Sequence, residues 1–284
     1  MLRRRKRVFE IGDDDVRKCT AGEDLIFIAG PCVIEGEDFT LKCAEKLLQI
    51  AEKHKIQLIF KASYDKANRT SVKSFRGPGL EKGLEILAKV RSKVGLPVLS
   101  DVHCKEEIEP AGEVLDVIQI PAFLARQTDL VVGAAKTQKP LHIKKPQFSS
   151  PASTKYIVEK AESTGNQKII LCERGFAFGY GDLVVDFRGI PIMQQWALVT
   201  FDGTHSLQKP SAGDGISEGE RIFSPYLSRA AAAVGVDGFF FEVHPEPEKA
   251  LSDPKTSITF EMFEEIIQDI KKIQDALWKN LKSS

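Results

Sequence analysis

The sequence predicts an α/β protein with a (β/α)8 fold, a TIM barrel, in a single domain. Eight short apolar runs lie along the chain, each closed by a polar or charged residue, and stretches long enough for a helix separate them. Such runs are typical of parallel strands that are buried on both faces. The length of 284 residues also suits this fold, which typically needs about 250.

The elements follow the chain in a regular alternation. The expected strands are 25–30, 57–62, 97–102, 117–122, 141–145, 169–174, 198–203 and 238–243. Helical spacing of apolar residues predicts helices in the intervals, with Asp38 as the N-cap of the first. These helices are expected at 38–54, 79–94, 104–114, 128–138, 152–164, 188–197, 221–234 and 257–281. Residues 25–284 therefore form the barrel, and residues 1–24 form an N-terminal extension whose basic run, 3–7, is expected to be solvated.

Three connections are longer than is usual between barrel elements. They are 62–78, 174–188 and 203–220, and all three fall on the side where the strands end. Long loops in a compact domain usually have a function. The third is rich in Gly and Ser, which predicts a mobile flap over the mouth of the barrel.

Composition excludes several classes of function. The 40 basic residues balance the 40 acidic ones, so no overall field attracts nucleic acid or an anionic membrane. No apolar stretch has the length of a membrane span. The five cysteines are odd in number and lack CxxC spacing, which favours a reducing compartment, and we expect a cytoplasmic protein.

Cationic side chains gather near the ends of the predicted strands. They are Lys61, Lys66, Arg69, Lys144, Lys145 and Arg174. A single lysine or arginine is usually a solvated surface charge. Because the carboxyl ends of barrel strands meet at one mouth, these cations are expected to share a pocket. A neutral protein with so many cations at one mouth should bind phosphate and carboxylate groups.

A second group combines a thiol, an imidazole and two carboxylates. Cys32 follows the first run, His205 the seventh and Glu242 ends the eighth, with Asp253 in the loop beyond. The eighth strand of a closed barrel adjoins the first and the seventh, so the four can meet. This donor set suits iron(II), zinc or manganese. The alternative is a buried cysteine and a hydrogen-bonded histidine with no metal, and spacing alone leaves both open.

Seven motifs resemble 3-deoxy-D-manno-octulosonate 8-phosphate synthases. They are AGPCVIE (29–35), FKASYDKANRTS (60–71), FRGPGLEKGL (75–84), IQIPAFLARQTDL (118–130), CERGFAFGYGDLVVDFR (172–188), THSLQ (204–208) and EVHPEPEKALSD (242–253). The resemblance implies a (β/α)8 barrel, usually a homotetramer, that condenses phosphoenolpyruvate with arabinose 5-phosphate for lipopolysaccharide synthesis. It covers about residues 25–280.

The resemblance also implies roles for individual residues. Lys61 and Lys66, with Gln119 nearby, would hold the phosphoenolpyruvate carboxylate, and Lys144 and Arg174 its phosphate. Asn68 and Asp101 would contact arabinose hydroxyls, and Arg69 and Thr70 the sugar phosphate. Members with cysteine after the first strand are metal-dependent, so Cys32 implies a divalent ion on Cys32, His205, Glu242 and Asp253. Catalysis would then fall to Lys61, Lys66, His205 and Asp253.

Three other functions remain open at this stage. The related synthase that uses erythrose 4-phosphate shares the barrel and the metal, and KANRTS is the segment that argues against it. A lyase-type aldolase would form a Schiff base on Lys61 or Lys144. A barrel that only binds phosphorylated metabolites is favoured solely by departures from the family pattern, Pro146 and the flap at 208–219.

Overall fold

The computed structural model describes residues 7–69, 71–210 and 218–277. Eight parallel strands form a closed barrel in the order β11-β14-β3-β4-β5-β6-β7-β8. They are β3 (Ile26–Gly30), β4 (Gln57–Lys61), β5 (Val98–Asp101), β6 (Val117–Ile120), β7 (Leu141–Lys144), β8 (Ile169–Glu173), β11 (Leu198–Asp202) and β14 (Gly238–Glu242). The predicted TIM barrel in a single domain is confirmed.

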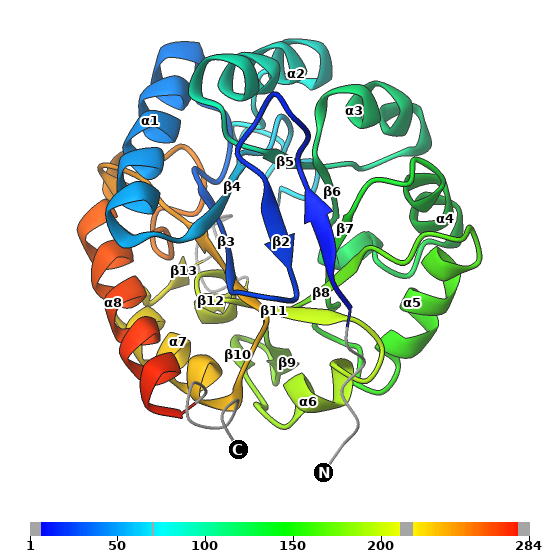
Figure 1. Cartoon of the computed structure of the whole chain (residues 1–284), viewed down its shortest axis with the longest axis vertical. Coiled ribbons are helices and arrows are strands. Elements are labelled where there is room, and N and C mark those ends of the chain that lie inside the picture. The colour runs from blue at the N-terminus through cyan, green and yellow to red at the C-terminus, as the bar shows by residue number, and fades with distance from the viewer. Residues whose placement is uncertain (1–6, 70, 211–217, 278–284) are drawn as a thin grey trace.

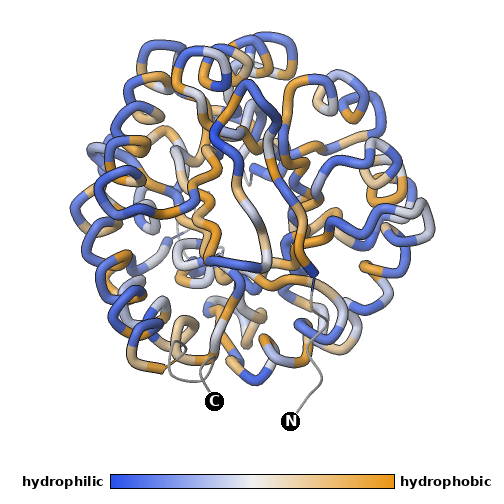
Figure 2. The backbone as a smooth tube through the Cα atoms, viewed as in Figure 1, coloured by the Kyte–Doolittle hydropathy of each residue, from blue (hydrophilic) through white to orange (hydrophobic). Residues whose placement is uncertain are grey.

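Helices surround the barrel as an outer layer (Figure 1). They are α1 (Glu37–His54), α2 (Leu80–Lys89), α3 (Ile108–Val114), α4 (Thr128–Lys136), α5 (Thr154–Glu162), α6 (Gly189–Met193), α7 (Ser224–Val234) and α8 (Phe260–Leu277). Their apolar faces turn toward the strands, and hydrophilic residues lie outside (Figure 2). None of the helices in the described ranges has both the length and the apolar character needed to cross a bilayer.

Several helix boundaries differ from expectation. Asp38 is wrong as an N-cap: Gly36 holds that position with a φ of 146°, which favours glycine, and Asp38 lies in the first turn. The helix expected at 79–94 changes to a π-helical turn over Val90–Val94. The helix expected at 188–197 is short, ending at Met193, and residues 278–281 of the last predicted helix lie outside the described ranges.

A hairpin of β1 (Phe9–Ile11) and β2 (Cys19–Ala21) crosses one end of the barrel (Figure 1). Its residues Ile11, Cys19 and Ala21 are buried and join the apolar cluster inside the barrel. The described part of the N-terminal extension is therefore packed. Arg7 corrects the expectation of a solvated basic run, because it is buried and bonds Glu162 and the carbonyl of Gln167; residues 3–6 lie outside the described part.

Two of the long connections form short hairpins at the other end. The loop expected at 174–188 contains β9 (Phe176–Phe178) paired with β10 (Asp182–Val184). The predicted flap contains β12 (Gln208–Lys209) paired with β13 (Glu218–Gly219), and its centre, 211–217, lies outside the described residues. The carboxyl ends of the strands thus carry the long loops, while the N-terminal hairpin closes the opposite end.

Replacement of Ile11 with Ala should destabilise the protein without changing its activity. Ile11 is 1% exposed, so truncation leaves a cavity that costs about 3 kcal/mol of unfolding free energy. Urea unfolding measures the loss, and Val8→Ala, at a position that is 45% exposed, is the matched control. An Ile11→Ala protein as stable as the wild type would show that the hairpin does not support the barrel.

Candidate active site

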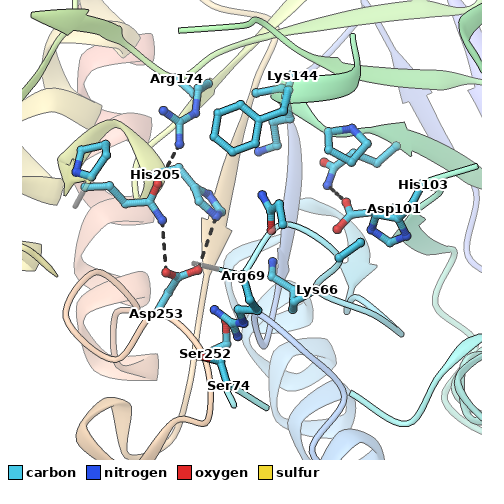
Figure 3. Close-up of a pocket in the computed structure, with 18 of the residues that line it drawn as sticks. Lys66, Arg69, Ser74, Asp101, His103, Lys144, Arg174, His205, Ser252 and Asp253 are labelled. Carbon is cyan, nitrogen blue, oxygen red and sulfur yellow. Dashed lines mark hydrogen bonds and ion pairs between the residues drawn. The ribbon is translucent and has the colours of Figure 1, made fainter. Parts of the chain in front are cut away.

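The mouth of the barrel encloses a cavity of about 630 Å³. Side chains from six strand ends line it, together with the loops after β4 and β14 (Figure 3). Those predicted from sequence are Lys61, Lys66, Asn68, Arg69, Asp101, Gln119, Lys144, Arg174, His205 and Asp253. Thr70 lies outside the described residues. Convergence of parallel strands therefore brings most of the predicted cations and carboxylates into one pocket. The expectation is wrong for Lys145, which is fully buried and does not line the cavity.

Cys32, Glu242 and Asp253 form a buried group, the ligand cluster, in which one possible metal-ligand atom of each residue lies within 4.8 Å of the others. The thiol of Cys32 is 3.2 Å from Asp253 Oδ2 and 2.6 Å from the hydroxyl of Ser252. His205 Nε2 faces the same cluster, 3.3 Å from Glu242 Oε1 and 3.9 Å from Asp253 Oδ2. The four side chains predicted from the sequence are thus brought together.

The cluster fits a divalent cation on two grounds. Glu242 Oε2 is buried and has no hydrogen-bond partner within the described part of the chain, which leaves a ligand atom free. Thiol, imidazole and carboxylate together are the donor set of a borderline metal ion. Burial raises the pKa of the Cys32 thiol, and the charge of Glu242 raises it further. Metal binding would therefore release the thiol proton.

Asp202 was not among the residues predicted from the sequence, but the structure places it against two of them. It is fully buried at the end of β11, and its Oδ2 lies 2.5 Å from Lys144 Nζ and 2.8 Å from His205 Nδ1. Its Oδ1 accepts hydrogen bonds from the backbone N–H groups of Thr204 and His205. Asp202 thereby holds the proton on His205 Nδ1 and leaves Nε2 free to face the cluster. Asp202 could have been predicted from its position at the end of an apolar run, which is how Asp101 was selected.

Two lysines compensate the negative charge of Glu242. Lys61 Nζ lies 2.9 Å from Glu242 Oε1 and donates to the carbonyl of Cys32 at 2.7 Å, while Lys66 Nζ is 3.9 Å from Glu242. Burial alone would raise the pKa of Glu242, but His205 and the two lysines hold it well below its usual range. Lys66 lies at the cavity wall, so its ammonium can contact both Glu242 and a bound anion.

Lys144 and Arg174 present a second pair of cations. The ammonium of Lys144 lies 3.0 Å from the centre of the Phe240 ring. Arg174 Nη2 donates to Gln208 at 2.7 Å, and the Gln208 amide donates to Asp253 at 3.1 Å, which links the guanidinium to the ligand cluster (Figure 3). Arg174 Nη1 is buried without a hydrogen-bond partner among the described residues. It can donate to an anion in the cavity.

The far side of the cavity has polar groups suited to a sugar. Asp101 accepts hydrogen bonds from Ser63, at 2.7 Å, and from the amide of Gln119. Burial would raise the pKa of Asp101, but Lys61 and Lys66 lower it below its usual value. The carboxylate is therefore charged and can accept hydrogen bonds from hydroxyl groups.

The loop after β4 supplies another cation and an amide. Arg69 Nε donates to the carbonyl of Phe75 at 3.1 Å, and its buried Nη2 has no partner in the described ranges. Asn68 is exposed at the cavity rim. His103, whose Nδ1 is 3.1 Å from Glu107, also lines the cavity.

A family model described as the DAHP synthetase I family matches residues 9–277. The chain belongs to this family. Three relatives are each named 2-dehydro-3-deoxyphosphooctonate aldolase. The protein from Geotalea daltonii is 56% identical over 256 residues, and that from Desulfatibacillum aliphaticivorans is 54% identical over 256 residues; each match covers 90% of this chain and 94% of the relative. The protein from Koribacter versatilis is 51% identical over 272 residues, 95% of this chain and 96% of its own.

Asp202→Asn should weaken metal binding by about 10- to 100-fold, because His205 loses the carboxylate that fixes its tautomer. Cobalt(II) titrated into metal-free protein measures the affinity through its visible absorption. Asp101→Asn removes another buried carboxylate at the mouth that does not contact His205, so its cobalt affinity should equal that of the wild type. Equal affinities in all three proteins would exclude the orienting role of Asp202.

Proposed function

We propose that this protein condenses phosphoenolpyruvate with arabinose 5-phosphate and water, giving 3-deoxy-D-manno-octulosonate 8-phosphate and inorganic phosphate. The observation that carries the proposal is one cavity lined by two separate sets of cations beside a buried cluster of ligand side chains. The relatives are named for a phosphorylated eight-carbon acid. Removing the three carbons of phosphoenolpyruvate from eight leaves a pentose, which favours arabinose over the four-carbon erythrose.

Phosphoenolpyruvate would occupy the inner part of the cavity. Lys61 and Lys66 would hold its carboxylate, near Gln119, and Lys144 and Arg174 its phosphate. The guanidinium of Arg174 keeps Nη1 free to donate to a phosphate oxygen. These placements put the enol phosphate between the cation pairs, with its reacting carbons facing the ligand cluster.

Arabinose 5-phosphate would occupy the outer part. Asp101 and Asn68 would bind its hydroxyls, and Arg69 and Thr70 its phosphate. The free Nη2 of Arg69 supports this assignment for Arg69. The aldehyde end would then reach inward to the enol phosphate.

The reaction needs positioning and charge stabilisation more than a strong base. Carbon 3 of phosphoenolpyruvate attacks the aldehyde carbon, whose oxygen takes up a proton, and a water molecule adds at carbon 2 and loses a proton. The resulting hemiketal phosphate collapses with cleavage of its carbon–oxygen bond, which releases phosphate. Lys61 and Lys66 would stabilise charge near carbon 2, and His205 and Asp253 would border the reacting atoms.

We also propose that the enzyme is the metal-dependent form of this synthase. Cys32, His205, Glu242 and Asp253 would hold iron(II), zinc or manganese. A divalent ion there would supply Lewis-acid polarisation of the aldehyde or the attacking water. The free Glu242 oxygen and the presence of Cys32 support this form.

We further propose a cytoplasmic homotetramer that serves lipopolysaccharide synthesis. The five cysteines, all in the described part of the chain, are free thiols, as a reducing compartment requires. A Schiff-base aldolase has less support. Lys61 Nζ lies 2.9 Å from Glu242 and Lys144 Nζ 2.5 Å from Asp202, so a buried carboxylate already engages each lysine nitrogen that would have to attack a carbonyl carbon.

Phosphate release from phosphoenolpyruvate tests the reaction. We expect release with arabinose 5-phosphate at least about 100-fold faster than with erythrose 4-phosphate, since a pocket that binds a hydroxyl discriminates strongly against a sugar lacking it. Borohydride should trap no adduct. Faster release with erythrose 4-phosphate would assign the related synthase, and no release with either aldehyde would leave a binding protein.

Removal of the metal tests the proposed form. A chelator should abolish activity, and added divalent metal should restore it. Cys32→Asn should retain part of its activity after chelation, because the family resemblance implies a metal-independent form with asparagine at this position. Metal-free wild-type protein that turns over at the full rate would refute the ligand assignment, and an equally metal-dependent Cys32→Asn protein would refute the role of Cys32.

A further inference from the structure

A buried ion pair lies behind the two cations assigned to phosphate. Along β7 and β8, side chains alternate between the barrel interior and the helix layer. Lys144 and Arg174 line the cavity, and their chain neighbours Lys145 and Glu173 leave on the opposite face, where both side chains are 0% exposed. Lys145 Nζ and Glu173 Oε1 are 3.4 Å apart.

The pair binds both backbone groups of Gly175, the residue that follows Arg174. Glu173 Oε1 accepts a hydrogen bond from the N–H of Gly175 at 2.7 Å, and Lys145 Nζ donates to the carbonyl of Gly175 at 3.0 Å. The Lys145 ammonium also lies 3.6 Å from the centre of the Phe176 ring. Both ends of the residue next to Arg174 are therefore fixed by one ion pair.

The pair also ties together the ends of two strands. The ladder between β7 and β8 ends where Lys144 lies opposite Cys172, and the last bond runs from the N–H of Lys145 to the carbonyl of Cys172, at 2.9 Å. Beyond that point the Lys145 and Glu173 side chains connect the two segments. Because Lys144 precedes Lys145 and Arg174 follows Glu173, this connection fixes the separation of the two phosphate cations.

Stability gives a poor account of these charges. Burial lowers the pKa of Lys145 and raises the pKa of Glu173, as expected where desolvation exceeds the attraction between the partners. Glu173 Oε2 has no hydrogen-bond partner in the described part of the protein. Apolar residues of similar size often replace such pairs without loss of stability. The pair is better explained by a site that needs Lys144 and Arg174 held at a fixed distance from each other.

We propose that Lys145 and Glu173 are positioning residues that set Lys144 and Arg174 around the phosphate of phosphoenolpyruvate. The inference rests on the proposed function and extends it, because neither residue lines the cavity. Loss of the pair should weaken phosphoenolpyruvate binding while leaving the arabinose 5-phosphate side unchanged.

The test compares Lys145→Met and Glu173→Gln in the full chain. Calorimetric titration should give a Kd for phosphoenolpyruvate about tenfold higher than in the wild type. In steady-state kinetics, the KM for phosphoenolpyruvate should rise in parallel, while the KM for arabinose 5-phosphate should stay within about twofold of the wild-type value. The matched control is Asp116→Asn. Asp116 is a buried carboxylate at the start of β6, 3.2 Å from Arg91 and away from the mouth. This variant should lower Tm without changing Kd.

Wild-type phosphoenolpyruvate affinity in both variants, with Tm lowered as in Asp116→Asn, would overturn the inference and leave a structural pair. If a variant does not fold, Glu173→Asp replaces it, because aspartate keeps the charge but withdraws the carboxylate from Lys145 and Gly175. A Kd for phosphoenolpyruvate raised about threefold or more in Glu173→Asp supports the positioning role. An unchanged Kd in Glu173→Asp would refute it. Because titration needs no turnover, a wild type that binds phosphoenolpyruvate but releases no phosphate would refute the proposed function alone.

Discussion

Pairing of β14 with β3 closes the barrel, and the ligand cluster depends on that closure. The register places Glu242 opposite Gly30, two residues before Cys32. Gly30 in turn lies against β4 so closely that a Cβ there would come within 2.0 Å of the Lys61 carbonyl oxygen. Only glycine permits this approach. Closure therefore makes neighbours of Glu242, Cys32 and Lys61, which lie far apart along the chain.

Charge compensation is the second constraint on the site. An isolated buried charge is costly, so buried ionisable groups occur in pairs or around ions. Glu242 is balanced by Lys61, Lys66 and His205, and Asp202 is balanced by Lys144 and His205. His205 belongs to both sets, so it connects the ligand cluster to the cations proposed to hold phosphate. Removal of any one of these charges should therefore alter the electrostatics both at Glu242 and at Asp202.

The pocket keeps some polar atoms unpartnered, and these have chemical meaning. Glu242 Oε2, Arg174 Nη1 and Arg69 Nη2 are buried without hydrogen-bond partners among the described residues. Such atoms are costly unless a ligand satisfies them. One lies in the ligand cluster, one beside Lys144 and one in the loop after β4. One carboxylate oxygen and two guanidinium nitrogens suit one cation and two anionic groups, as the proposed reaction requires.

The sequence alone predicted the barrel and most of the residues of the candidate site. A parallel barrel strand is short, apolar on both faces and ended by a polar residue, so run ends marked Lys61, Asp101, Lys144, Arg174 and Glu242. The N-terminal hairpin was missed, because three-residue strands carry too little periodicity to be recognised. The N-cap at Asp38 was wrong, since glycine can begin a helix without a side-chain cap.

Chain order and residue type thus determined the fold and which side chains could do chemistry. Tertiary structure decided which of them are partners. That Asp202 bridges Lys144 and His205, that Gln208 links Arg174 to Asp253, and that Lys145 pairs with Glu173 follow from strand register and side-chain direction. These distances are fixed when the barrel closes, and no local pattern in the sequence encodes them.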